Sequence, residues 1–174
     1  MQKQKASDKS GSHVRMSPME MRDFDFSQAN AHDASSIFEK WKWVRHGSIH
    51  LDDGFTLIAS RGGEIGGFIS VQWRTLPAPL NGADEGFIDI IEVQESVRRE
   101  GIGRRLIQMA QMRCRERKVY QLRAWSSEDK KEAIPMWHAL GFGLCPATEY
   151  PKGQPVRGYF VAKPICSTQT EAVA

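Results

Sequence analysis

Cysteine is scarce in this sequence, and a long apolar run is absent. The three cysteines, Cys114, Cys145 and Cys166, are odd in number and do not show the spacing of metal ligands. This pattern is typical of free thiols in a reducing compartment, so the sequence predicts a cytoplasmic protein that holds no metal. No stretch approaches the ~20 consecutive apolar residues of a membrane helix. The first residues also lack the apolar core of a signal peptide, so no membrane partner is expected.

An excess of charge of one sign is also missing. The formal net charge is +3, which is too small by itself to indicate nucleic acid. Between Arg98 and Arg123 nine basic residues stand against two acidic ones, but no recognition-helix or RNA-binding motif accompanies them. The sequence therefore predicts that nucleic acid is not a partner.

The length of 174 residues suits one domain. Residues 1–20 are polar and weakly basic, and we interpret them as a disordered tail or a cloning remnant. The domain itself is expected over residues 21–165, followed by a frayed tail over 166–174.

The first half of the domain is predicted to contain one helix among several strands. A strand is predicted over 21–26, and a helix over 27–45, where apolar residues recur at spacings of three and four. Strands over 55–60 and 65–76 flank Arg61-Gly62-Gly63-Glu64, which indicates a hairpin. Residues 77–86 are rich in Pro, Asn and Gly and predict a loop.

The second half alternates strands and helices. A strand over 87–93 is apolar enough to be buried on both faces, and a helix follows over 102–117. A strand over 120–125 and a short helix over 132–140 precede a final hairpin formed by 142–147 and 156–165. This order, β-α-β-β-β-α-β-α-β-β, predicts an α/β (α+β) fold with a mixed, mostly antiparallel sheet and helices on both faces.

The most informative stretch is EVQESVRREGIGRRL, residues 92–106. A strand, a glycine-containing turn and a helix place free backbone N–H groups at the helix start, where they and the helix dipole attract anions. Glycine lets a phosphate approach the backbone, and the arginines add charge-assisted hydrogen bonds. The stretch therefore predicts a pyrophosphate site. It is neither a dinucleotide GxGxxG motif nor a Walker loop.

Two motifs together carry a family resemblance. The run V-x-x-x-x-R-R-x-G-I-G-x-x-L, residues 93–106, is followed some thirty residues later by A-I-x-M-W-x-x-L-G-F, residues 133–142. The combination resembles the GNAT superfamily of acyl-CoA-dependent N-acetyltransferases. The resemblance implies a splayed pair of central parallel strands, acetyl-CoA as co-substrate, and transfer of the acetyl group to a primary amine of a small molecule or peptide. It also implies that a homodimer could form through the terminal strands.

The same resemblance assigns the cofactor contacts. The backbone of a bulge at residues 91–93 would pair with the pantetheine arm, and the amides of 99–104 would hold the pyrophosphate. Lys130 stands where the family usually has Asn, and Trp137 where it often has a Tyr that protonates the leaving thiolate. The expected cofactor-binding residues are Ile91, Glu92, Val93, Arg98, Arg99, Glu100, Gly101, Ile102, Gly103, Arg104, Lys130, Ala133 and Trp137.

For catalysis, the backbone N–H of Val93 is expected to stabilise the oxyanion, because a bulge would leave it unpaired. Asp89 is the first candidate for the base that takes the proton of the amine, on the same strand face as Val93. The alternative for Asp89 is a carboxylate that a neighbouring backbone group or arginine satisfies. Glu92 is the second, with its side chain on the opposite face. The indole of Trp137 cannot supply a proton. Either the thiolate leaves unaided, or the protein binds acyl-CoA without efficient transfer.

The acceptor is not identified by any motif. The loops over 45–54, 77–86 and 147–156 would choose it. Asp84 with Glu85 could attract a cationic amine, although a solvated loop fits them better. His46, His50 and His138 could act as bases, although surface or capping roles fit them better. The rival function is a non-catalytic acyl-CoA-binding or regulatory module.

Overall fold

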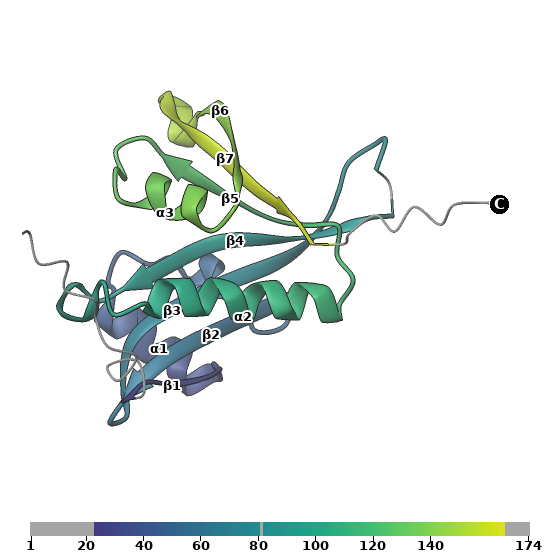
Figure 1. Ribbon diagram of the computed structural model, residues 1–174. Helices are drawn as coiled ribbons and strands as arrows, with labels where there is room; N and C mark the ends of the chain where they lie inside the picture. Colours follow the sequence, from purple (N-terminus) through teal and green to yellow (C-terminus); the bar gives the residue numbers. More distant parts are fainter. Residues whose placement is uncertain (1–22, 81, 166–174) are drawn as a thin grey trace, which may run out of the picture.

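The computed structural model describes residues 23–80 and 82–165 (Figure 1). Its elements follow the order expected from the sequence. Within the described residues seven strands form one sheet in the order β1-β2-β3-β4-β5-β7-β6. The strands are β1 (Asp25–Gln28), β2 (Gly54–Arg61), β3 (Glu64–Thr75), β4 (Asp84–Val93), β5 (Gln121–Ser127), β6 (Gly143–Glu149) and β7 (Val156–Pro164).

Only the β4–β5 pair of this sheet is parallel, as the mixed-sheet prediction required. The pairing runs from Glu85 opposite Gln121 to Ile88 opposite Ala124 and then stops, although both strands continue. Figure 1 shows β5, β7 and β6 turning away from the rest of the sheet beyond this point. The splayed parallel pair is thereby confirmed.

Helices cover both faces of the sheet. Helix α1 (Ala31–Lys40) lies on one face, where Ile37 belongs to a buried cluster with Phe68 of β3. Helices α2 (Ile102–Glu116) and α3 (Ala133–Ala139) belong to the larger core on the other face. Short 3₁₀ turns complete the structure: η2 (His46–Ser48), η3 (Glu95–Val97) and η4 (Pro151–Gly153).

The first strand and the first helix are both shorter than the sequence predicted. The strand is Asp25–Gln28, because Phe24 turns into the core, while residues 21–22 lie outside the described residues. The helix begins after Asn30, whose side-chain oxygen accepts hydrogen bonds from two backbone N–H groups of the first turn. Asp33 accepts a hydrogen bond from the N–H of Asn30 and completes a capping box.

Strand β4 begins at Asp84, three residues before its predicted start, and is less buried than predicted. Its first part lies between β3 and β5, and Ile88 is buried there. From Asp89 to Val93 every residue is only half-buried. Loss of the β5 neighbour opens this end of the strand, so the expectation of burial on both faces was wrong.

Helix α2 is anchored by a close approach to β4. Its buried residues include Ile102, Leu106 and Cys114, and burial raises the pKa of the Cys114 thiol to about 12. A Cβ atom on Gly86 of β4 would lie 2.8 Å from Cys114 Sγ. Glycine at this position therefore sets the distance between the strand and the helix.

We expect Gly86→Ala to destabilise the protein by about 1–3 kcal/mol, because the added methyl group overpacks the core beneath α2. Urea denaturation measures the change in the free energy of unfolding. Gly47→Ala is the matched control, since a Cβ there would meet nothing within 4 Å. Equal effects of the two substitutions would contradict this role of Gly86 in packing.

Candidate active site

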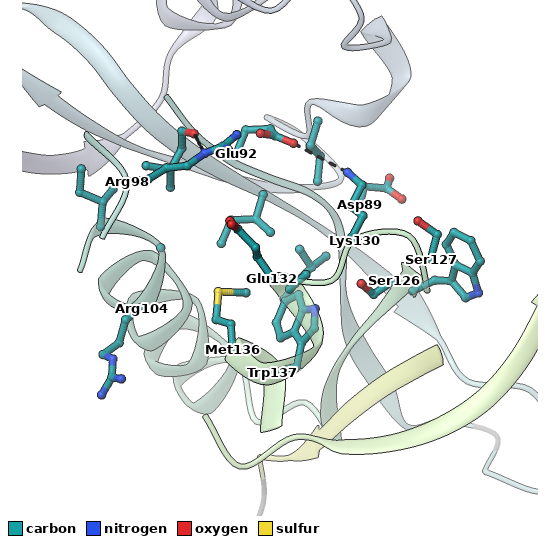
Figure 2. Close-up of a pocket in the computed structure, with 18 of the residues that line it drawn as sticks. Asp89, Glu92, Arg98, Arg104, Ser126, Ser127, Lys130, Glu132, Met136 and Trp137 are labelled. Atoms are coloured by element: carbon teal, nitrogen blue, oxygen red, sulfur yellow. Dashed lines mark hydrogen bonds and ion pairs between the residues drawn. The ribbon is translucent and has the colours of Figure 1, made fainter. Parts of the chain in front are cut away.

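The gap between β4 and β5 opens into a cleft with a volume of about 1070 Å³. Its walls come from the end of β4, the start of α2, the β5–α3 loop, α3, and the segment that follows α1 (Figure 2). The lining residues predicted from the sequence are Asp89, Ile91, Glu92, Val93, Arg98, Arg99, Gly101, Ile102, Gly103, Arg104, Lys130, Ala133 and Trp137. The fold thus brings two distant motifs to one cavity.

One end of the cleft is the N-terminus of α2. Gly101 has the left-handed conformation (φ 86°), and no side chain caps the helix. The N–H of Arg105 donates to Gly101 O. The N–H groups of Ile102, Gly103 and Arg104 therefore precede the first intrahelical hydrogen bond. Three free donors at the positive end of a 15-residue helix form a site suited to a phosphate.

Arg98 ties the loop to the strand. Its Nε donates to Val93 O at 3.1 Å, so this side chain occupies the carbonyl of the last β4 residue. Arg99 has a positive φ of 69°, and Arg104 lies in the first turn of α2 beside the cleft. Glu100 is half-buried and pairs with Arg61 at 3.5 Å, and it does not line the cleft.

The backbone of β4 presents a free edge to the cleft. Gln94 and Gly66 form a hydrogen-bonded pair, because Gln94 N donates to Gly66 O. Glu92 and Phe68 face each other two residues further along the same two strands. Because antiparallel pairs alternate, the N–H groups of Ile91 and Val93 point away from β3. They point toward β5, whose pairing has already ended. Val93 thus has an available N–H, as expected, but strand splaying is the cause.

The bulge in β4 lies upstream of its predicted position. Ser70 faces Ile90 and Val71 faces Ile88, so Asp89 is the extra residue. The expected position was residues 91–93, and this expectation was wrong. A bulge also shifts the alternation of side chains along a strand.

The shift puts the two candidate bases on the same face. Ile91 and Val93 pack against the core beneath α2, so Glu92 between them points to the opposite face. Asp89 contacts His50, which is bound to Ser70 on that same opposite face. The expectation that Asp89 shares a face with Val93 was therefore wrong. Both carboxylates reach the cleft from the α1 side of the sheet.

Glu92 is the less constrained of the two carboxylates. Burial raises the pKa of its carboxyl group, while the charges of Lys130 and Arg98 act in the opposite direction. Lys130 Nζ lies 3.9 Å from Glu92 Oε1 and 5.8 Å from the centre of the Trp43 ring. A carboxylate whose pKa is raised and that is open to a cleft is a stronger base than an ordinary carboxylate.

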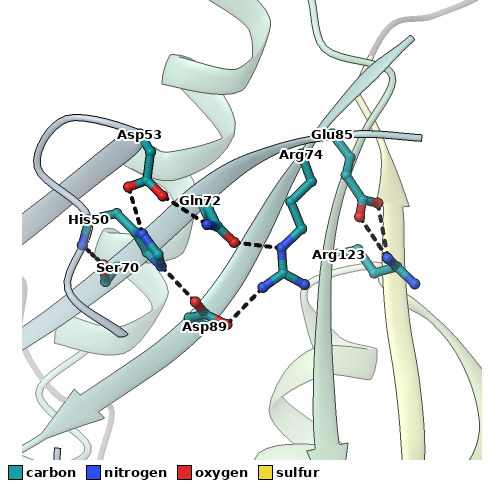
Figure 3. Close-up of polar contacts among 8 residues, drawn as sticks. All are labelled: His50, Asp53, Ser70, Gln72, Arg74, Glu85, Asp89 and Arg123. Atoms are coloured by element: carbon teal, nitrogen blue, oxygen red, sulfur yellow. Dashed lines mark hydrogen bonds and ion pairs between the residues drawn. The ribbon is translucent and has the colours of Figure 1, made fainter. Parts of the chain in front are cut away.

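Asp89 is held on both oxygens by a closed ring of side chains (Figure 3). Arg74 donates to Oδ1 at 3.1 Å, and His50 Nε2 lies 2.6 Å from Oδ2. His50 Nδ1 lies 2.8 Å from Asp53, which accepts from Gln72. Gln72 in turn accepts from Arg74 Nε at 2.7 Å, which closes the ring.

The ring has a defined proton requirement. Both contacts of His50 are hydrogen bonds only when both ring nitrogens carry a proton, because each partner is a carboxylate. Hydrogen bonds from Gln72 and His50 lower the pKa of Asp53. The ring joins the segment before β2 to β3 and to the bulge of β4, so it fixes the backbone that precedes Ile91.

Other predicted residues have structural roles. Glu85 is 1% exposed, and both of its oxygens accept hydrogen bonds from Arg123. The expectation that it could attract a cationic amine was therefore wrong. Trp41 packs edge-on against Phe68, in the core. His46 stacks on Phe38 at 4.1 Å.

Trp137 is 3% exposed and packs edge-to-face on Phe142. Its Nε1 atom is buried without a hydrogen-bond partner among the described residues. Such an orphaned donor is rare in a protein interior. It lies in a residue that lines the cleft, at the position where the resemblance implies a tyrosine.

Comparisons with known proteins agree with this geometry. A model of the acetyltransferase (GNAT) family matches residues 15–142. The chain belongs to the acetyltransferase (GNAT) family. Comparison with curated protein sequences finds no match. The solved structures that resemble it share its fold at low sequence identity.

Three of these solved structures are informative. The ribosomal-protein-S18-alanine N-acetyltransferase from Escherichia coli is 17% identical, with a TM-score of 0.67 over 85% of this chain and 97% of that one. NAA60 from Arabidopsis thaliana in complex with acetyl-CoA is 15% identical, with a TM-score of 0.69 over 82% and 99%. The putative acetyltransferase yncA from Salmonella typhimurium, with its cofactor acetyl-CoA, is 15% identical, with a TM-score of 0.64 over 87% and 99%.

The cleft of this GNAT protein fits acetyl-CoA on its own features. The uncapped helix start suits the pyrophosphate, and the unpaired edge of Ile91 and Val93 suits the amides of the pantetheine arm. A Cβ on Gly103 would project into the space between Val93 Cγ2, at 3.7 Å, and Met136 Sδ, at 3.9 Å. Among the described residues no group of side chains could hold a metal ion, and no helix could cross a membrane.

Sequence reasoning missed the ring around Asp89. His50 was named as a candidate base, but its partners come from three separate segments, and no local pattern links them. The one available signal is the unusual run of polar residues Gln72 and Arg74 inside an otherwise apolar strand.

We expect His50→Ala to destabilise the protein by about 2–3 kcal/mol, because it removes a buried side chain and takes one hydrogen-bond partner from the partly buried carboxylate of Asp89. Chemical denaturation at neutral pH measures this loss. His32→Ala, at an exposed position of α1, is the control and should have little effect. A loss for His50→Ala as small as that of the control would show that the ring does not hold the fold.

Proposed function

We propose that the protein is an acetyl-CoA-dependent N-acetyltransferase that acts on a primary amine of a small molecule or peptide. One observation carries this proposal: the splay of β4 and β5 places Glu92, the free N–H of Val93 and the uncapped start of α2 in a single cleft. The similar structure from E. coli is that of an alanine N-acetyltransferase, which supports an amine acceptor in this fold.

Acetyl-CoA would supply the acetyl group as a thioester. The N–H groups of Ile102, Gly103 and Arg104 would bind its phosphates, and the edge of β4 would align its arm. The N–H of Val93 would stabilise the negative charge that develops on the carbonyl oxygen.

Glu92 is proposed as the base, directly or through one water. Its carboxylate faces the cleft, whereas both oxygens of Asp89 are held by Arg74 and His50. Asp89 then acts by fixing the bulge. Because Trp137 has no titratable proton, the thiolate leaves without an acid from this residue, and its ordinary pKa of about 8–9 allows that.

Gly101→Asp should abolish binding of acetyl-CoA in a calorimetric titration, because it adds an anion and strains a residue at φ 86°. Gly153→Asp is the matched control, since Gly153 has φ 76° and nothing within 4 Å of its Cβ position. The control should bind like the wild type. Equal binding by all three proteins would contradict the phosphate site.

Glu92→Gln should lower turnover by about a hundredfold or more, the usual contribution of a positioned base. In the wild type turnover should fall as pH drops through the pKa of Glu92, which burial places above its ordinary value, because the protonated acid cannot accept a proton. The variant should lack this acid limb. Glu95→Gln, at an exposed neighbouring position, is the control.

If Asp89 is the base, the pH profiles of the variants give the opposite result. If Asp89→Asn removes the acid limb while Glu92→Gln keeps it, the proton goes to Asp89 and this assignment fails. Binding of acetyl-CoA without turnover across a broad panel of amines would support the regulatory module instead.

A further inference from the structure

Lys130 places a primary amine in the cleft, beside the proposed base Glu92. Figure 2 shows its side chain crossing from the β5–α3 loop to Glu92 on β4. Nζ lies 3.9 Å from Glu92 Oε1, and the side chain is 57% exposed. The charge of Lys130 is also close to the ring of Trp43, an exposed residue on the opposite wall.

Lys131 also lines the cleft, but the ion pair with Glu92 is made by Lys130, and this placement differs from that of Lys40 and Lys163. Lys40 Nζ binds Glu64, a 73% exposed carboxylate outside the cleft, and also Ile65 O. Lys163 Nζ donates to Leu140 O at 2.7 Å. The amine of Lys130 instead lies near Glu92, a half-buried carboxylate that itself lines the cleft.

The geometry resembles that of a bound acceptor. Glu92 immediately precedes Val93, whose N–H points into the gap between β4 and β5. An amine beside Glu92 is therefore next to the position proposed for the acetyl carbonyl. A tethered amine also reacts without the entropy cost of binding, which gives it a high effective concentration.

We propose that the protein acetylates its own Lys130 when acetyl-CoA is bound and no external acceptor is present. The inference rests on the proposed function. Neutral Lys130 Nζ, its proton passed to Glu92, attacks the thioester carbonyl. A C–N bond forms and the C–S bond breaks, so CoA leaves as the thiolate. The amine loses its second proton to solvent, and acetyl-lysine and free CoA are the products.

Acetylation removes the positive charge of Lys130. Glu92 then keeps only Arg98 of the two cations that act on it, and Trp43 loses the charge over its ring. A cationic acceptor no longer competes with Lys130 for Glu92. Self-acetylation therefore primes the cleft for cationic amines, with a lower KM after modification.

The test is incubation of the full chain with acetyl-CoA alone, followed by tryptic peptide mass spectrometry. Acetyl-Lys130 blocks cleavage within residues 124–131, and fragmentation separates it from Lys131. Label is expected on Lys130 well above that on Lys42, an exposed lysine outside the cleft that reports chemical background. Glu92→Gln should slow labelling of Lys130 about a hundredfold and leave Lys42 unchanged.

Two outcomes overturn the inference. Label on Lys130 no greater than on Lys42 contradicts it, as does a rate constant that rises with protein concentration, which means transfer between molecules. Turnover of an added amine by the wild type separates this failure from failure of the proposed function. If the wild type acetylates an added amine while Lys130 stays unlabelled, the enzyme stands and self-acetylation falls. If the wild type acetylates nothing and acetyl-CoA still binds, both proposals fall.

Discussion

The site depends on where one parallel pairing ends. Strands β4 and β5 pair as far as Ile88 and Ala124 and then separate, although each strand continues. Up to that point β4 is a core strand. Beyond it, the backbone N–H groups of Ile91 and Val93 have no strand partner, and the side chains from Asp89 onward border a cleft. Strand β4 therefore runs from the core to the edge of the cleft without any change in secondary structure.

Side-chain hydrogen bonds on both faces of the sheet hold this open edge of β4 in place. On the α1 side, the ring of His50, Asp53, Gln72, Arg74 and Asp89 fixes the bulge and turns Glu92 to the same face as Asp89. On the α2 side, Arg98 holds Val93 O and joins the strand to the loop before the helix. A polar network of this kind makes the backbone around it rigid when every member is satisfied. The chain thus supports the free edge through side chains instead of a neighbouring strand.

The order of the elements and the glycine-containing start of α2 were predictable from the sequence, because both depend on local patterns. The apolar periodicity of α2 and the glycines 101 and 103 lie within one short stretch. The bulge was misplaced by at least two residues, since it is set by the register between β3 and β4, and no local signal records that register. The side chain of Asp89 was assigned to the wrong face of the sheet for the same reason. The ring was missed because its members lie far apart in the sequence, and the pairing of Glu85 with Arg123 depends on the parallel register.

The proposed binding mode has acetyl-CoA along the free edge of β4 and at the start of α2. Hydrogen exchange of the wild-type protein, with and without acetyl-CoA, is the decisive measurement, because exchange reports backbone amides residue by residue. We expect slower exchange at Ile91, Val93 and the amides of 102–104, with no change across α1. Unchanged exchange at these amides, or protection spread equally over α1, would contradict this binding mode.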